Sequence, residues 1–149
     1  MVRKTVLFFL CLAVIAPAAL AATPELGRFS GKTSQGFNVA VRTKEAKHAR
    51  FFAIRWSAGC GEQGTYKALA TLESLKLGPK GGFTGHVFYT DTLKKGKSTR
   101  VYVKLAGRFT SSKTAAGKWR GAVRLLQGKK QLAYCKSGLV SWSAKLEQG

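Results

Sequence analysis

The stretch that decides the fold begins at Cys135, ends at Lys145 and reads C-K-S-G-L-V-S-W-S-A-K. In and around it, apolar residues recur on one parity, and most residues of the other parity are small or polar. The parity that we expect to be buried holds Leu132, Tyr134, Val140, Trp142, Ala144 and Leu146. A period of two is typical of a β-strand with one buried face. We therefore predict a closing strand here, with Trp142 as its largest core residue.

The same alternation recurs along the rest of the sequence, between turn signals rich in glycine, proline and lysine. We expect strands near residues 26–31, 37–42, 52–56, 66–77, 83–89, 101–109 and 119–125, followed by the closing strand. A charged loop is expected over residues 43–50, and its K-E-A-K-H-A-R run could form a short helical turn. About eight strands at regular spacing predict an all-β fold, a single antiparallel β-barrel or β-sandwich.

Residues 1–21 have the features of a signal peptide. Arg3 and Lys4 precede an apolar run, which Pro17 interrupts before the small-residue site Ala19-Leu20-Ala21. A retained membrane anchor is the alternative, but the run is short for a span and no later stretch qualifies. We therefore predict cleavage after Ala21, a single mature all-β domain over residues 22–149, no stable membrane span in it, and a secreted or cell-envelope location.

The mature protein keeps two cysteines, Cys60 and Cys135. In an oxidising compartment a disulfide is the default, and two cysteines leave one pairing. A zinc site would need clustered ligands, so no metal and no cofactor is expected. Cys60 shares the core parity of Trp56, whereas Cys135 opposes that of Trp142. A bulge near Gly59 or near Gly138 would reconcile the two facings.

Positive charge dominates the composition. Without Arg3 and Lys4, 24 basic residues face 6 acidic ones, a net charge of +18. Such a balance attracts anionic partners or serves solubility. On two neighbouring predicted strands, basic residues and one tyrosine take the outer parity: Arg100, Tyr102, Lys104 and Arg108 on the first, and Lys118, Arg120 and Arg124 on the second. Paired as a hairpin, these strands would form a stripe that can follow a polyanion, because like-parity residues repeat every ~6.7 Å. The alternative is a solvated face that only prevents edge aggregation.

A short unit with the pattern G-x-F-[ST] occurs three times, with its phenylalanine at Phe29, Phe83 and Phe109. We expect each of these rings to enter the core. The N-terminal G-R-F-S-G-K-T-S-Q-G, a central C-G, the G-R-F-T before a basic loop and the C-terminal C-K-S-G-L-V-S-W-S-A resemble a group of uncharacterised secreted bacterial β-proteins. The resemblance covers nearly the whole mature sequence. It implies export and an all-β fold, and it implies no activity or site.

Signals for catalysis are lacking. His48 and His86 are expected to be exposed, and the acids are too scattered for a paired-carboxylate site. No nucleophile elbow, H-E-x-x-H motif or phosphate loop occurs. We therefore expect a monomeric, non-catalytic cationic domain that associates with anionic envelope or extracellular polymers. The alternative is a small β-barrel that holds a small apolar ligand. The residues expected to line its interior are Phe29, Phe52, Trp56, Phe83, Trp119 and Trp142.

Overall fold

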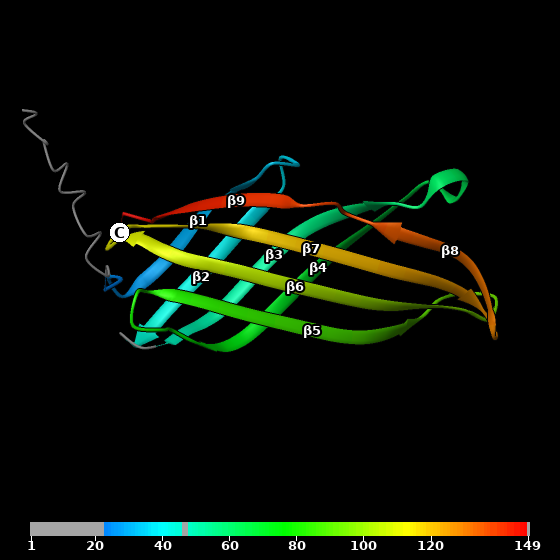
Figure 1. The fold of residues 1–149 in the computed structure, drawn as a ribbon, viewed down its shortest axis with the longest axis horizontal. Helices are drawn as coiled ribbons and strands as arrows, with labels where there is room; N and C mark the ends of the chain where they lie inside the picture. Colours follow the sequence, from blue (N-terminus) through cyan, green and yellow to red (C-terminus); the bar gives the residue numbers. More distant parts are fainter. Residues whose placement is uncertain (1–22, 46–47, 149) are drawn as a thin grey trace, which may run out of the picture.

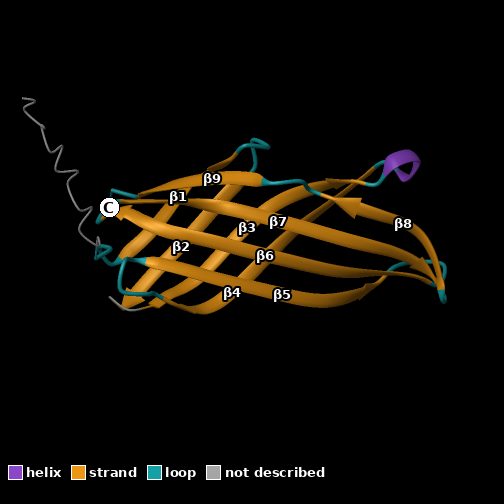
Figure 2. Cartoon of the chain, in the orientation of Figure 1, coloured by secondary structure: helices purple, strands orange, loops and turns teal. Residues whose placement is uncertain are grey.

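A computed structural model describes residues 23–45 and 48–148 of the protein. The predicted signal peptide and its cleavage site lie outside these residues. The described part forms nine strands and a single turn of 3-10 helix, and every strand pairing is antiparallel, which confirms the all-β prediction (Figure 2). The elements are β1 (Gly27–Thr33), β2 (Asn38–Glu45), β3 (His48–Gly59), η1 (Gly61–Gln63), β4 (Thr65–Lys76), β5 (Gly82–Thr92), β6 (Lys97–Ser111), β7 (Thr114–Gln127), β8 (Lys130–Lys136) and β9 (Val140–Leu146).

The strands belong to one sheet that rolls over on itself. Its order is β4-β3-β2-β1-β9-β7-β6-β5, and β8 pairs with β7 and, at one position, with β3. Strands β1–β4 and β5–β8 therefore form two meanders, and the last strand, β9, lies between them. In Figure 1, β1–β4 run diagonally behind β5, β6 and β7, so the apolar face of the sheet is enclosed between two layers.

The edge strands of this sheet, β4 and β5, meet without forming a hydrogen-bonded ladder. Near the turn that joins them, Leu72 and Leu75 lie against the backbone of Gly85. Further along, the side chains of Tyr66 of β4 and Tyr89 of β5 interact across the two edges. Burial, with smaller contributions from Tyr66 and Asp91, raises the pKa of Tyr89 far above its usual value. The two tyrosines therefore connect the edges where the strands diverge.

Aromatic rings and close-fitting glycines form the centre of the core. Phe52 stacks on Trp119 with ring centroids 6.3 Å apart, and Trp56 lies 6.0 Å from Trp119. Trp142 meets Phe52 edge-on at 5.1 Å. Trp56 lies directly against the backbone of Gly121, where a Cβ atom would lie within 2.7 Å of the indole. The lack of a Cβ at this position of β7 is thus what admits the largest ring of β3.

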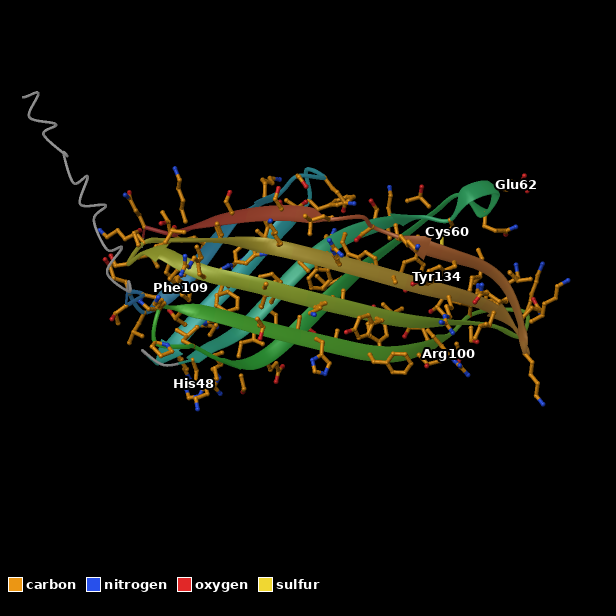
Figure 3. The ribbon with its side chains drawn as sticks, in the orientation of Figure 1. His48, Cys60, Glu62, Arg100, Phe109 and Tyr134 are labelled. Carbon is orange, nitrogen blue, oxygen red and sulfur yellow. A yellow bond between two sulfur atoms is a disulfide. The ribbon has the colours of Figure 1, made fainter. Side chains whose placement is uncertain are left out.

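The repeated G-x-F-[ST] units meet at one end of the core. Phe29 of β1 contacts Phe109 of β6 with centroids 5.2 Å apart, and Phe83 of β5 lies 5.8 Å from the same ring. All three rings are buried, as the sequence predicted. Phe109 lies near the left end of the molecule in Figure 3. The repeat therefore contributes one aromatic contact to each of three strands that are distant in sequence.

The prediction of a single closing strand is wrong in one respect. Two strands form there, β8 and β9, separated by three residues that include Gly138 with a φ of 69°. This break reverses the facing, so Cys135 is buried and Tyr134, expected in the core, is 48% exposed. Cys135 forms the predicted disulfide with Cys60, across a sequence separation of 75. The reversal near Gly138 is one of the two positions expected from the cysteine parities.

The prediction of a charged loop over residues 43–50 is also wrong. Strand β2 continues to Glu45 and β3 begins at His48. Thr43, in the middle of this stretch, is buried, and its hydroxyl donates to the carbonyl oxygen of Glu25 at 2.8 Å. Alternation is interrupted here by irregular pairing between β2 and β3, which is why the sequence pattern resembled a loop.

A candidate polyanion-binding face

The predicted stripe residues lie on β6 and β7, which pair as a hairpin. The residues between them, such as Val103 and Val123, are fully buried, so the side chains of the stripe point outward. All of the predicted residues are exposed: Arg100, Tyr102, Lys104, Arg108, Lys118, Arg120 and Arg124. The structure therefore brings the outer-parity residues of the two predicted strands together on one outer surface.

The register of the hairpin places like charges opposite one another. Arg100 of β6 pairs with Arg124 of β7, and Lys104 pairs with Arg120. Opposed residues of an antiparallel pair have Cβ atoms about 5 Å apart, and like charges at that distance are destabilising. None of these basic residues forms an ion pair within the part of the molecule that the structure describes. Their mutual repulsion is thus left without a protein carboxylate to offset it.

Arg108 and Lys118 extend the stripe toward the other end of the hairpin. Lys118 lies opposite Ala106, and Arg108 lies opposite Ala116. Ala106 separates Arg108 from Lys104 along β6, whereas Lys118 lies two residues from Arg120 on β7. The stripe is therefore densest around Arg100, Lys104 and their partners, and sparser beyond them.

Lysines at two turns extend the charge at the densely basic end. The N–H of Gly128 donates to the carbonyl oxygen of Gly96, and the amide group of the Gln127 side chain donates to that of Lys95. These bonds hold the β5–β6 and β7–β8 turns side by side. The exposed lysines that gather there are Lys94, Lys95, Lys129 and Lys130.

Exposed aromatic rings lie among the basic residues. Phe88 of β5, 62% exposed, pairs with Tyr102, 46% exposed. Tyr134 of β8 lies next to Arg124, whose guanidinium carbon is 5.8 Å from the ring centroid, and the ammonium of Lys136 is 5.1 Å from the same ring. Figure 3 shows Tyr134 and Arg100 in the same half of the molecule, on β8 and β6, the two strands that flank β7. We call this outer surface of β5–β8 the basic-aromatic face.

Phe88, Tyr134 and Lys136 were missed by sequence reasoning. Phe88 shares its parity with His86 and Thr90, a polar pattern that could have revealed an outward ring. Tyr134 was assigned to the core, because an uninterrupted closing strand gives it the parity of Trp142. Lys136 could not be placed until the break at Gly138 was known.

Carboxylates are absent from the outward positions of β5–β8, all of which the structure describes. Asp91, at the end of β5, is exposed, but it has the parity of Tyr89 and lies opposite the buried Thr99, so it does not share the parity of Phe88. Glu62 lies on η1, which projects from the upper right of the molecule in Figure 3. The basic-aromatic face therefore presents one sign of charge, which focuses its field on anions.

The geometry gives little support for other kinds of site. Within residues 23–45 and 48–148 no cluster of three or more His, Cys, Asp or Glu residues could hold a metal ion, and no helix is long and apolar enough to cross a membrane. His86 is exposed beside Lys104. The aromatic residues expected to line a ligand cavity are packed in the core, where they lie against one another or against Phe109 with ring centroids 5.1–6.3 Å apart.

Comparisons with known protein families, curated proteins and solved structures give no match for this sequence. The resemblance to secreted bacterial β-proteins therefore stays a prediction.

Proposed function

We propose that the protein is an exported, non-catalytic β-domain that binds anionic polymers of the envelope or extracellular space through its basic-aromatic face. The observation that carries this proposal is the opposition of Arg100 to Arg124 and of Lys104 to Arg120, without a neighbouring carboxylate. A polyanion would neutralise both pairs at once. Binding would also release counterions from the polymer, which is the main driving force for such association.

The exposed rings favour a polymer that can also stack. Phe88, Tyr102 and Tyr134 lie between the cations, and base–aromatic stacking contributes roughly 1–3 kcal/mol per base. A face that served only solubility would gain nothing from rings in these positions. The combination is typical of surfaces that follow a single-stranded polyanion.

Salt-dependent binding to heparin and to single-stranded DNA tests this function. The substitutions Arg100→Gln, Lys104→Gln, Arg120→Gln and Arg124→Gln, made together, should weaken binding. They should also flatten the dependence on salt by about 0.7 logarithmic units per lost contact on single strands. A matched control replaces four lysines on β1, β4 and β9 and has the same net charge: Lys32→Gln, Lys67→Gln, Lys76→Gln and Lys145→Gln. Equal losses in both variants would mean that only total charge matters, and no salt-sensitive binding at all would exclude the function.

A second comparison isolates the rings. Phe88→Ser with Tyr134→Ser should weaken DNA binding more than heparin binding, because heparin has no bases to stack. Equal effects on both polymers would restrict the face to charge recognition.

A further inference from the structure

A second basic surface lies on the opposite meander, where neighbouring strands are irregular. On β3, Arg50 and Phe51 both face outward between the buried Ala49 and Phe52. On β4, Glu73 and Ser74 do the same between Leu72 and Leu75, and Ser74 has a φ of 55°. A bulge places two successive residues on one face, and bulges are over-represented beside functional sites. An αL conformation at a non-glycine residue is a further feature that concentrates at such sites.

These irregularities surround a surface pocket of about 780 Å³. Its walls come from β2, β3 and β4, and it is lined by Arg42, Lys44, His48, Arg50, Phe51, Glu73 and Ser74. In Figure 3, His48 lies at the lower left, well separated from Arg100 and Tyr134. The pocket is therefore distinct from the basic-aromatic face.

One basic and one acidic residue of the pocket lie on either side of an aromatic ring. Arg42 pairs with Phe51, and Phe51 pairs with Glu73, so the three form one row across β2, β3 and β4. Two strand spacings separate Arg42 from Glu73, roughly 10 Å at the backbone. Among the described residues, neither Arg42 nor Glu73 forms an ion pair. Both ends of the row are thus available to a ligand that spans the ring.

The side chains that line the pocket indicate which class of ligand it binds. Arg42, Arg50 and Lys44 provide the donors that bind a phosphate, and two arginines can do so with bidentate geometry. Glu73 can only accept hydrogen bonds when ionised, so it selects hydroxyl groups. Phe51 between them offers an apolar surface. We propose that this pocket binds a small phosphate ester with hydroxyl groups at its far end, such as a sugar phosphate.

The carboxylate also separates this site from a polyanion site. A polymer with repeated charges would meet Glu73 as a repulsive group, whereas the basic-aromatic face has no acidic residue among its outward positions, all of which are described. The proposed binding of a phosphate ester therefore depends only on the residues of the pocket. It can hold even if the protein binds no polyanion.

Calorimetric titration with glucose 6-phosphate and inorganic phosphate tests the assignment, with glucose as the uncharged control. Arg42→Gln with Arg50→Gln should weaken binding of both phosphates about tenfold or more, because charge-assisted bonds are lost. Lys67→Gln with Lys145→Gln removes the same charge at exposed positions outside the pocket and outside the basic-aromatic face, and should leave both affinities within about twofold.

Glu73→Gln gives the sharpest result, because the two probes should respond in opposite directions. Binding of glucose 6-phosphate should weaken, since its hydroxyl groups lose a charged acceptor. Binding of inorganic phosphate should strengthen, since a repulsive carboxylate is gone. Changes of the same sign for both probes, no saturable binding of glucose 6-phosphate, or an equal loss in the Lys67/Lys145 variant would overturn the proposal.

Discussion

Arg100 of β6 lies directly opposite Arg124 of β7 on the basic-aromatic face. A cross-strand pair of opposite charges stabilises a sheet by roughly 0.2–1 kcal/mol, and a like-charge pair opposes folding on a similar scale. Arg124 recovers part of this through the ring of Tyr134, 5.8 Å from its guanidinium carbon. The arrangement weakens the free protein and favours a bound anion.

Replacing one member of this pair should therefore stabilise the domain. Arg124→Gln is expected to raise the free energy of unfolding by a few tenths of a kcal/mol, about the size of one surface charge pair. Urea unfolding at low salt measures it. At about 1 M salt the gain should vanish, because the Debye length falls to about 3 Å. A destabilised variant at low salt would show that the contact with Tyr134 outweighs the repulsion.

A second prediction concerns the space beneath Trp56. Gly121→Ala should lower the free energy of unfolding by about 1–3 kcal/mol, since the new methyl group overlaps the indole. Gly59→Ala is the matched control, because a Cβ at that end of β3 meets nothing within 4 Å. It should change stability by less than about 0.5 kcal/mol. Equal stabilities for the two variants would contradict this account of the core.

The disulfide should make a large contribution to stability. Cys60→Ser with Cys135→Ser is expected to cost about 4 kcal/mol, because the unfolded polypeptide regains the freedom of a long loop. Denaturant unfolding of the variant, and of the native protein with and without reductant, measures the loss. Mass spectrometry after alkylation provides the control: labelling of either cysteine without reductant would mean that the bond does not form.

Alkaline pH should weaken the junction between β4 and β5. Tyr89 has a pKa raised by burial, whereas in the unfolded polypeptide it ionises near pH 10. The folded state therefore holds its phenolic proton more tightly, so this stabilisation is present below pH ~10 and is lost as the pH rises beyond it. Tyr89→Phe should reduce the fall in stability above pH ~10, and Tyr134→Phe should not. Unfolding curves between about pH 8 and about pH 12 compare the variants, and identical alkaline slopes would refute the prediction.

Alternation alone located most of the strands and the outward basic residues. It works for β6 because Val101, Val103 and Leu105 are buried without interruption. It failed at Tyr134, because a period-two pattern cannot reveal where a strand breaks and its facing reverses. One glycine, Gly138, separates the predicted facing from the observed one.

Register and irregular pairing explain what else the sequence left open. The spacing of Arg100 and Arg124 in the sequence does not show that they meet. The turn between β6 and β7 determines which residues of the two strands pair. The pocket around Phe51 depends on interruptions in two adjacent strands, β3 and β4. In the sequence, the interruption in β3 adjoins the stretch that was expected to be a loop, whereas the one in β4 lies within residues 66–77, which were expected to form a strand.

The position of β9 has a consequence for how the domain reaches its native state. This strand lies between β1 and β7, and it pairs with both. Each meander is continuous in sequence, but the strand that joins the two comes after all the others. Such long-range pairing is slow to form. A polypeptide that lacks β9 should thus leave the two meanders unjoined, and the domain can close only once this last strand is present.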